Sequence, residues 1–488
     1  MTNSLKRESA KGVFWSFLEK FGSRVILLIT QIILARLLSP EDFGLIGMLT
    51  VFIIISQVFV DSGFGNALIQ KQDANKLDYS TVFFCNIIVS IVLYGILFFT
   101  APLVAGFFNQ IELIWLLRFV GLILFFDSLG VVQFAKFRRE LNFKVIAKAT
   151  VYANTIAAIV GILLAYYNFG VWALAVQMVL IYLFRTIFFW IYSDWIPSLL
   201  FSTKSFKELF NFGYKLLLSG LLDQVFQNIY ILIIGKFFSA KDLGYYTQAK
   251  NFSQVPVSTL YAIVGSVTFP VLSKLQAEPE KLLLALRKTI KLLAFVNFPL
   301  MLGLAVVAHP LFYYVLGERW LSAVPYFQLL CLSGTLYTLH AINLSILQVK
   351  GRTDLFLKLE LIKKGIGIVG IAIGVNWGIM GLVWSNVIVS FVAFFINSYY
   401  TNMLVHYPLL KQLKDLLPTF LASLIMVAVM LIVAKIYEMS IVLFLSQIII
   451  GVVSYFTITY VSKQEALIDG LKIIKEFIPI ERWKKKRY

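Results

Sequence analysis

The amino-acid sequence predicts an all-α integral membrane protein with about 14 transmembrane helices. Of its 488 residues, 60% are hydrophobic and only 14% are charged, whereas roughly a quarter of the residues in soluble domains are charged. Apolar runs long enough to cross a bilayer, which requires about 20 residues, recur along the whole chain. These runs lack the two-residue alternation of a barrel strand. Composition and pattern therefore both favour a bundle of membrane-spanning helices.

Short polar connections separate the expected helices. In chain order, these helices cover residues 12–38, 42–70, 79–108, 111–136, 143–166, 170–192, 205–238, 242–273, 281–316, 322–349, 355–374, 378–400, 411–437 and 441–462. Lysine and arginine gather in alternate connections and at both termini, which predicts that these parts lie in the cytoplasm. The net charge of +18 is thus explained by membrane topology, and no nucleic-acid partner is expected.

The chain also repeats itself. Residues 35–44 (ARLLSPEDFG) match residues 235–244 (GKFFSAKDLG), with a basic residue, Ser, Asp and Gly at the same spacing. Three further matches follow in order: 101–103 with 309–311, 136–141 with 350–355, and 168–170 with 376–378. Two parallel six-helix repeats with two C-terminal helices appended account for these matches, which is a transporter architecture. The expected divisions are 1–200 and 201–402 for the two halves, 403–463 for the appended transmembrane helices and 464–488 for a basic cytoplasmic tail.

The candidate substrate-binding residues are polar side chains within the spans. They are Glu19, Ser23, Arg24, Asp61, Lys215, Ser219, Asp223, Gln224, Gln227 and Lys250. Most of them lie on the first helix of each repeat, where the repeat offset pairs Ser23 with Asp223. Polar groups inside a membrane are costly and usually face a cavity or one another. The alternative is that they only hydrogen-bond neighbouring helices, or that Lys250 extends its amine to the interface.

Signatures of catalysis are missing from the sequence. It has no phosphate-binding GxxxxGK[ST] motif, and no large external loop offers paired carboxylates or a Ser/His/Asp set. Cys85, Cys331 and the three histidines are widely separated, so no metal cluster is expected. We therefore expect a protein that is not an enzyme and that needs no cofactor and no metal.

Four sequence segments carry a family resemblance. They are Lys11-Gly12 with Trp15, residues 35–44, Asp61-Ser62-Gly63-Phe64, and Phe134 with residues 138–141. On these segments the chain resembles bacterial polysaccharide flippases of the Wzx type, in the colanic-acid-exporter-like branch of the multidrug/oligosaccharidyl-lipid/polysaccharide exporter superfamily. The resemblance implies that the chain moves undecaprenyl-pyrophosphate-linked oligosaccharide units across the bacterial inner membrane for surface polysaccharide biosynthesis. It also implies membrane lipids, a polysaccharide polymerase and other assembly proteins as partners.

Two other functions remain open at this point. A cation-coupled multidrug antiporter of the same fold would need a mainly acidic or aromatic pocket, and a membrane glycan polymerase or ligase would need external catalytic residues. Within the flippase hypothesis, we expect Arg24 to contact the pyrophosphate or an acidic sugar. Asp223 would balance Arg24 when the cavity is empty.

Overall fold

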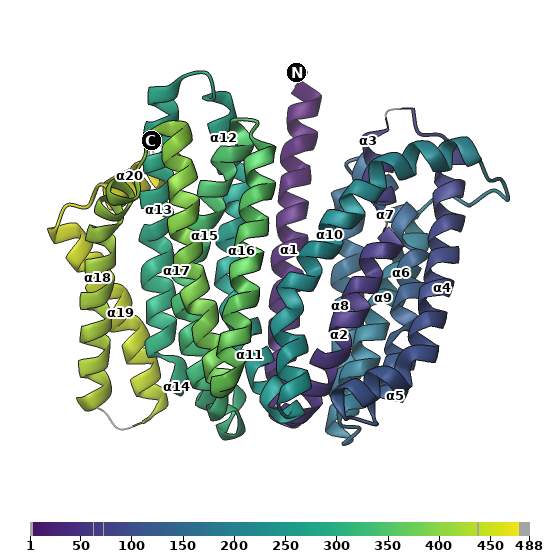
Figure 1. The fold of residues 1–488 in the computed structure, drawn as a ribbon, viewed down its shortest axis with the longest axis horizontal. Coiled ribbons are helices and arrows are strands. Elements are labelled where there is room, and N and C mark those ends of the chain that lie inside the picture. Colours follow the sequence, from purple (N-terminus) through teal and green to yellow (C-terminus); the bar gives the residue numbers. More distant parts are fainter. Residues whose placement is uncertain (1–2, 62, 72, 437–438, 478–488) are drawn as a thin grey trace, which may run out of the picture. The chain divides into compact units, whose positions relative to one another are not determined.

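The computed structural model describes residues 3–61, 63–71, 73–436 and 439–477, and these residues form helices and their connections without any strand (Figure 1). The chain divides into two compact units, Met1–Thr247 and Gln248–Tyr488, here called unit 1 and unit 2. The predicted all-α fold is confirmed.

Unit 1 contains ten complete helices among its described residues and the start of an eleventh. They are α1 (Asn3–Leu37), α2 (Pro40–Asp61), α3 (Phe64–Gln70), α4 (Lys76–Phe108), α5 (Leu113–Val120), α6 (Leu122–Ser128), α7 (Val131–Arg139), α8 (Phe143–Tyr166), α9 (Val171–Tyr192), α10 (Thr203–Phe237) and α11 (Ala240–Ile263). Helix α1 packs against α8, α8 packs against α9, and α10 packs against α2, α3 and α4. The last part of α11 belongs to unit 2.

Unit 2 continues with a second set of helices. They are η1 (Val264–Thr268), α12 (Phe269–Lys274), α13 (Pro279–Val306), α14 (Ala308–Leu311), η2 (Phe312–Leu316), η3 (Glu318–Ala323), α15 (Val324–Val349), α16 (Thr353–Gly374), η4 (Val375–Trp377), α17 (Gly378–Val405), α18 (Leu409–Ile436), α19 (Ile441–Val461) and α20 (Glu465–Phe477). Helix α15 packs between α13 and α17, and α18 packs between α13 and α19.

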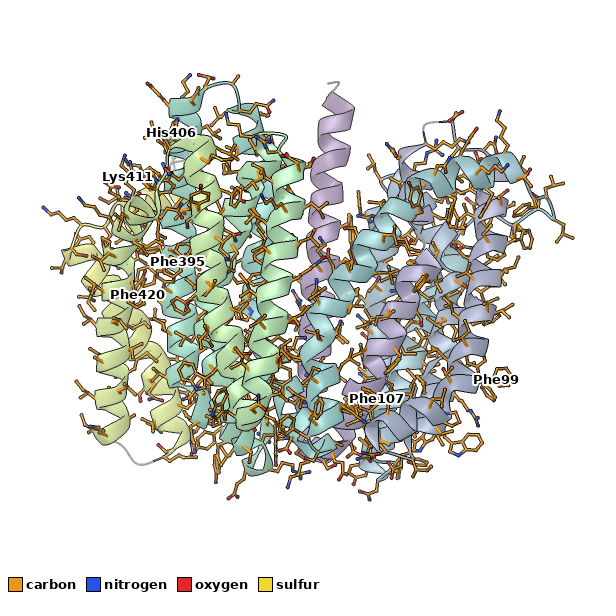
Figure 2. All side chains as sticks on the ribbon, viewed as in Figure 1. Phe99, Phe107, Phe395, His406, Lys411 and Phe420 are labelled. Carbon is orange, nitrogen blue, oxygen red and sulfur yellow. The ribbon has the colours of Figure 1, made fainter. Side chains whose placement is uncertain are left out.

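The outward faces of the long helices are apolar. Along α4, Ile88, Ile91, Phe99 and Leu103 are exposed, and the ring of Phe99, labelled in Figure 2, is 80% exposed. Such a continuous apolar stripe is stable only against lipid or another protein. Eleven segments of the described chain are long and apolar enough to span a membrane, and one of them, residues 353–405, contains both α16 and α17. The protein is therefore a multi-pass membrane protein.

The exact number of spans stays a prediction. Helices α1 and α11 are long but are not among the eleven segments. Both carry charged side chains along their length, including Glu19 and Arg24 on α1 and Lys250 on α11. The predicted total of about 14 requires that these two helices also cross the membrane.

Two predicted helices are interrupted at glycines. The predicted helix 42–70 breaks between α2 and α3 at Gly63, which has φ +68° and faces the backbone of Gly213 on α10. A Cβ atom at Gly63 would lie 2.7 Å from the carbonyl oxygen of Gly213, so only glycine fits this conformation. The predicted helix 111–136 is divided into α5, α6 and α7 near Gly121 and Gly130, where the side chains of Tyr94 and Thr186 pack against the glycines.

The two copies of the repeated motif contact each other within unit 1. A Cβ atom added to Gly44 would lie 1.7 Å from the carbonyl oxygen of Ala240. A Cβ atom added to Gly244 would lie 1.8 Å from the carbonyl oxygen of Pro40. The first turns of α2 and α11 therefore cross with each glycine seated against the first residue of the other helix. We call this contact the glycine crossing.

Hydrogen bonds at the start of each helix fix the glycine crossing. Asp42 accepts a hydrogen bond from the Ser39 hydroxyl at 2.7 Å, and Asp242 accepts one from the Ser239 hydroxyl at 2.6 Å. These residues occupy equivalent positions in the two copies of the motif. The shared Ser, Asp and Gly positions thus have the same local role in both copies.

The predicted division into halves at residue 200 stays a prediction. The two compact units are defined by contacts within the structure, whereas the predicted halves are defined by the sequence repeat. Helix α10, which begins the predicted second half, packs within unit 1. The predicted tail, 464–488, begins with helix α20, which is tied to α13 by ion pairs of Glu465 with Lys291 at 2.7 Å and of Asp469 with Lys288 at 3.2 Å.

Candidate functional site

A cavity of about 550 Å³ lies inside unit 1. Helices α2, α3, α6, α7, α9 and α10 contribute to its wall. Its polar and charged lining residues are Gln57, Asp61, Asn66, Asp127, Arg138, Tyr182, Arg185 and Gln224. Because these side chains project from apolar helices, the cavity offers hydrogen bonds and charge within an otherwise apolar bundle.

One arginine of the cavity, Arg185, forms an ion pair with a carboxylate. Arg185 on α9 donates from Nη2 to Oδ1 of Asp127 on α6 at 2.6 Å. The amide of Gln57 on α2 donates to Oδ2 of the same carboxylate at 3.0 Å. The Arg185 guanidinium also lies 4.6 Å from the centre of the Tyr182 ring. Asp127 is therefore held from two sides, and it joins α2, α6 and α9 at one wall of the cavity.

The second arginine of the cavity is differently placed. Arg138 on α7 lies 5.4 Å from the centre of the Phe134 ring, and no ion pair involves Arg138 among the residues that the structure describes. A guanidinium lining a cavity in this way has donors to offer to an anionic or hydroxyl-bearing ligand. Arg138 is thus the cationic group of this cavity best placed to bind a substrate.

Asp61 lines the cavity at the break between α2 and α3. Its carboxylate accepts a hydrogen bond from the backbone N–H of Gly65 in the first turn of α3. A Cβ at Gly65 would lie 2.9 Å from Asp61 Oδ1, so the close approach depends on glycine. Asp61, Gly63 and Gly65 therefore form part of the cavity wall, and Asp61 places a carboxylate in it.

The structure brings two of the predicted site residues, Asp61 and Gln224, into this cavity. The other described members lie elsewhere: Arg24, Ser219, Asp223 and Gln227 are exposed, Glu19 and Ser23 are half-buried, and Lys250 is half-buried on the part of α11 that belongs to unit 2. The side chain of Lys215 lies outside the described residues. The substrate-binding role of all these residues stays a prediction.

Sequence reasoning missed several lining residues. Gln57, Asn66, Tyr182 and Arg138 were not predicted as site residues, although Arg138 lies within a family-like segment. The sequence offered one usable signal, since Asp127 and Arg185 are opposite charges inside two predicted spans. Such pairs mark positions where two helices meet at a polar site.

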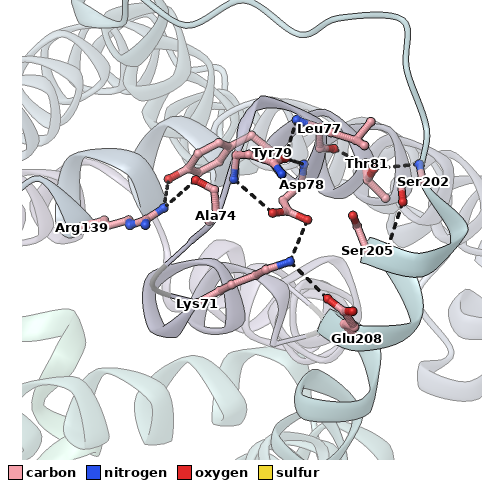
Figure 3. Close-up of polar contacts among 11 residues, drawn as sticks. Lys71, Ala74, Leu77, Asp78, Tyr79, Thr81, Arg139, Ser202, Ser205 and Glu208 are labelled. Atoms are coloured by element: carbon pink, nitrogen blue, oxygen red, sulfur yellow. Dashed lines mark hydrogen bonds and ion pairs between the residues drawn. The ribbon is translucent and has the colours of Figure 1, made fainter.

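A polar cluster ties α3, α4, α7 and α10 together at one end of unit 1 (Figure 3). Lys71 lies 3.1 Å from Asp78 on α4 and 3.2 Å from Glu208 on α10. Burial lowers the pKa of Lys71, but its hydrogen bonds to these two carboxylates outweigh burial and raise it. Arg139 on α7 donates to the hydroxyl of Tyr79 at 2.9 Å and to the carbonyl of Ala74 at 3.1 Å. The cluster holds the elements that form the cavity wall.

Unit 2 contains a cavity of different chemistry. It has a volume of about 400 Å³ and lies among α13, α14, α18 and α19. Its lining is almost wholly apolar and includes Phe295, Leu300, Met426, Phe444 and Tyr455. The hydroxyl of Tyr455 is satisfied by the carbonyl of Phe295 at 2.7 Å. This cavity suits a hydrocarbon chain better than a polar group.

Three comparisons agree with this architecture. Teichuronic acid biosynthesis protein TuaB of Bacillus subtilis is 28% identical over 72% of this chain and 73% of its own length. Lipopolysaccharide biosynthesis protein WzxC of Escherichia coli is 29% identical over 76% of each chain. The solved structure of the lipid II flippase MurJ in an inward closed conformation has a TM-score of 0.78, covering 93% of this chain and all of that one at 17% identity.

A helical membrane bundle with a polar cavity inside it is typical of membrane transporters. The sequence profile of the family described as "Polysaccharide biosynthesis protein" matches residues 33–325, which is more than half of the chain. The chain therefore belongs to that family, as the resemblance to polysaccharide flippases predicted.

Proposed function

We propose that this chain is a flippase that moves undecaprenyl-pyrophosphate-linked oligosaccharide units across the bacterial inner membrane during surface polysaccharide biosynthesis. The observation that carries the proposal is the charged cavity inside a membrane bundle, with Arg138 available and Arg185 held by Asp127. Family membership and relatives named for polysaccharide synthesis support it.

The cavity replaces water for the polar part of such a substrate. Carrying a pyrophosphate and sugar hydroxyls through hydrocarbon is prohibitive without hydrogen-bonding partners. Arg138 binds an anionic group, the amides of Asn66 and Gln224 donate hydrogen bonds to substrate hydroxyls or accept them, and the carboxylate of Asp61 accepts them.

The proposed cycle is alternating access, in which the polar cavity opens first to one side of the membrane and then to the other. Both termini and the basic connections lie in the cytoplasm. A polysaccharide polymerase and other assembly proteins receive the product on the far side. No step of this cycle requires catalysis by the chain.

The multidrug antiporter is the weaker candidate. Organic cations are bound by acidic or aromatic pockets, whereas the two aspartates of this cavity, Asp61 and Asp127, are balanced by two arginines, and the Asp127 carboxylate is already paired with Arg185. A cation entering the cavity would meet the positive charge of Arg138. The cavity chemistry therefore favours an anionic, hydroxyl-rich substrate.

Deletion of the gene tests the proposal. We expect lipid-linked oligosaccharide units to accumulate on the cytoplasmic face and surface glycan to disappear. Arg138→Ala should weaken substrate binding by about 10- to 100-fold, as expected for hydrogen bonds to a charged group, and Arg138→Lys should recover only part of it because the planar fork is lost. The matched control is Arg118→Ala, whose guanidinium contacts the Phe98 ring outside the cavity. If the deletion strain keeps its surface glycan and loses drug resistance, the proposal is contradicted.

A further inference from the structure

The connection between α9 and α10, residues 193–202, carries an unusual concentration of exposed apolar side chains. Ile196 is 77% exposed, Leu199 92%, Leu200 59% and Phe201 51%. The connection has no regular secondary structure. A polar loop would be expected at the surface of a protein in water, and contiguous apolar exposure of this kind indicates an interaction surface.

The connection is firmly held, so the exposure is built into the fold. Trp195 is buried, with its ring centre 6.1 Å from that of Tyr79 and 5.8 Å from that of Phe83. The backbone N–H of Ser198 donates to the Ser80 hydroxyl at 3.0 Å. The backbone N–H of Ser202 donates to the Thr81 hydroxyl at 3.1 Å (Figure 3). These anchors fix the backbone on α4 while the apolar side chains remain exposed.

The anchor points place the connection on the lipid-facing side of α4. The exposed stripe of α4 runs through Ile88, Ile91 and Phe99. Two turns before Ile88, at a spacing of about seven residues, the same face reaches Thr81. Thr81 and its neighbour Ser80 are fully buried because the connection covers them. The connection therefore extends the lipid-facing stripe beyond the end of the span.

Lysines flank these apolar residues. Lys204 and Lys207 in the first turns of α10 are exposed and, being three residues apart, share one face of the helix. Asp194 is the sole acidic residue between 193 and 207. Apolar side chains combined with lysines at the end of a span are the chemistry of a segment lying in the lipid headgroup region of an anionic leaflet.

We propose that residues 196–201, together with Lys204 and Lys207, form an interfacial anchor that inserts into the membrane leaflet on the basic side of the protein and binds anionic phospholipid headgroups. The anchor fixes the linker between the two predicted halves to the membrane surface. It is independent of which substrate is carried, so its test is separate from that of the proposed function.

The test uses the full chain in vesicles of phosphatidylcholine with brominated acyl chains and a varied share of phosphatidylglycerol. A fluorophore is attached at Leu199→Cys, and the matched control carries it at Asp73→Cys, an exposed polar position of the α3–α4 connection, which the Lys71–Glu208 ion pair ties to the start of α10. The native cysteines, Cys85 and Cys331, are buried, so each added thiol is the accessible one.

The anchor predicts that brominated lipid quenches the label at position 199 and that aqueous iodide does not, with the reverse at position 73. Replacing Lys204 or Lys207 with Gln should raise the share of phosphatidylglycerol needed for half-maximal quenching by about fivefold, since each lysine near an anionic surface contributes roughly 1 kcal/mol. Equal iodide quenching at both positions would overturn the anchor. Protection that appears only in native membranes would assign the surface to a partner protein and would also overturn it.

Discussion

Asp127 is the residue on which the polar wall of the cavity depends. It accepts from Arg185 and from Gln57, which come from two other helices. Asp127→Asn would leave the Arg185 charge without its counter-charge. Breaking a fully buried pair costs about 3–5 kcal/mol, and since these side chains are 28% and 21% exposed, we expect a loss on the order of 1–3 kcal/mol. The unfolding temperature of the purified protein measures this loss.

A double variant tests whether the loss of stability comes from the unpaired charge of Arg185. Asp127→Leu with Arg185→Met removes both charges, and stability should recover because no unpaired charge remains. Gln57→Ala serves as the milder comparison, with an expected loss of about 1 kcal/mol for one hydrogen bond. If Asp127→Asn unfolds at the temperature of the unmodified protein, the pair contributes nothing to the fold.

Arg24 and Asp223 give a second prediction at this scale. Both side chains are exposed, and neither is among those lining the unit 1 cavity. If Arg24 contacts the pyrophosphate or an acidic sugar, Arg24→Lys should impair export while the protein still inserts, and Arg24→Ala should impair it further. Arg24→Ala/Asp223→Ala should not restore export. Near-normal export by this double variant would mean that the two residues form only a structural pair.

The sequence allowed part of the site to be predicted. Asp61 and Gln224 could be found because a polar residue inside an apolar span is conspicuous. Arg138 and Asn66 could not, since each lies near a helix end, where a polar residue is also expected from contact with water. Their place in a common cavity depends on how α3 and α7 pack, which is a tertiary property.

At the scale of elements, hydropathy predicted where helices lie but not where they break. The predicted boundaries 143–166 and 441–462 differ by at most one residue from α8 and α19. The break between α2 and α3 was not predicted, because it depends on Gly63 meeting Gly213 from a distant helix. The π-helical turn η1 within the predicted helix 242–273 was likewise invisible to a hydropathy pattern.

The glycine crossing yields a prediction about two elements. Gly44→Ala or Gly244→Ala would force α2 and α11 apart, because the added Cβ has no space beside the opposing carbonyl. Overpacking of this kind typically costs about 1–3 kcal/mol. The controls Gly95→Ala and Gly106→Ala lie in α4 with no neighbouring atom within 4 Å, and they should be neutral or stabilising by up to about 1 kcal/mol.

Thermal unfolding and export measured on the same variants test the crossing. We expect both alanine variants at the crossing to lose stability and export, and both α4 controls to keep them. Wild-type behaviour of Gly44→Ala and Gly244→Ala would mean that the two first turns need not approach so closely in the working protein.

At the scale of the whole molecule, the repeated sequence and the compact units describe different properties. Both copies of the motif, 35–44 and 235–244, lie in unit 1, where they contact each other. Helix α11 then continues from unit 1 into unit 2. Whether the two repeats are parallel therefore depends on whether α11 crosses the membrane, and α11 is not among the eleven apolar segments.

Side-specific labelling decides this point by parity. If α11 spans, an even number of spans separates Asp73 from Ala277, and cysteines at these exposed positions are labelled from the same side of the membrane. If α11 does not span, Ala277→Cys is labelled from the opposite side, and the repeats are antiparallel. Tyr167→Cys, at the exposed connection between α8 and α9, is the control for the far side, because three spans separate it from Asp73 whether or not α11 spans. We expect positions 73 and 277 to react with an impermeant thiol reagent only after the cytoplasmic face is opened, and position 167 to react in intact cells. This outcome follows because Lys250 and the amides of α11 can enter the bilayer when they face a polar interior instead of lipid.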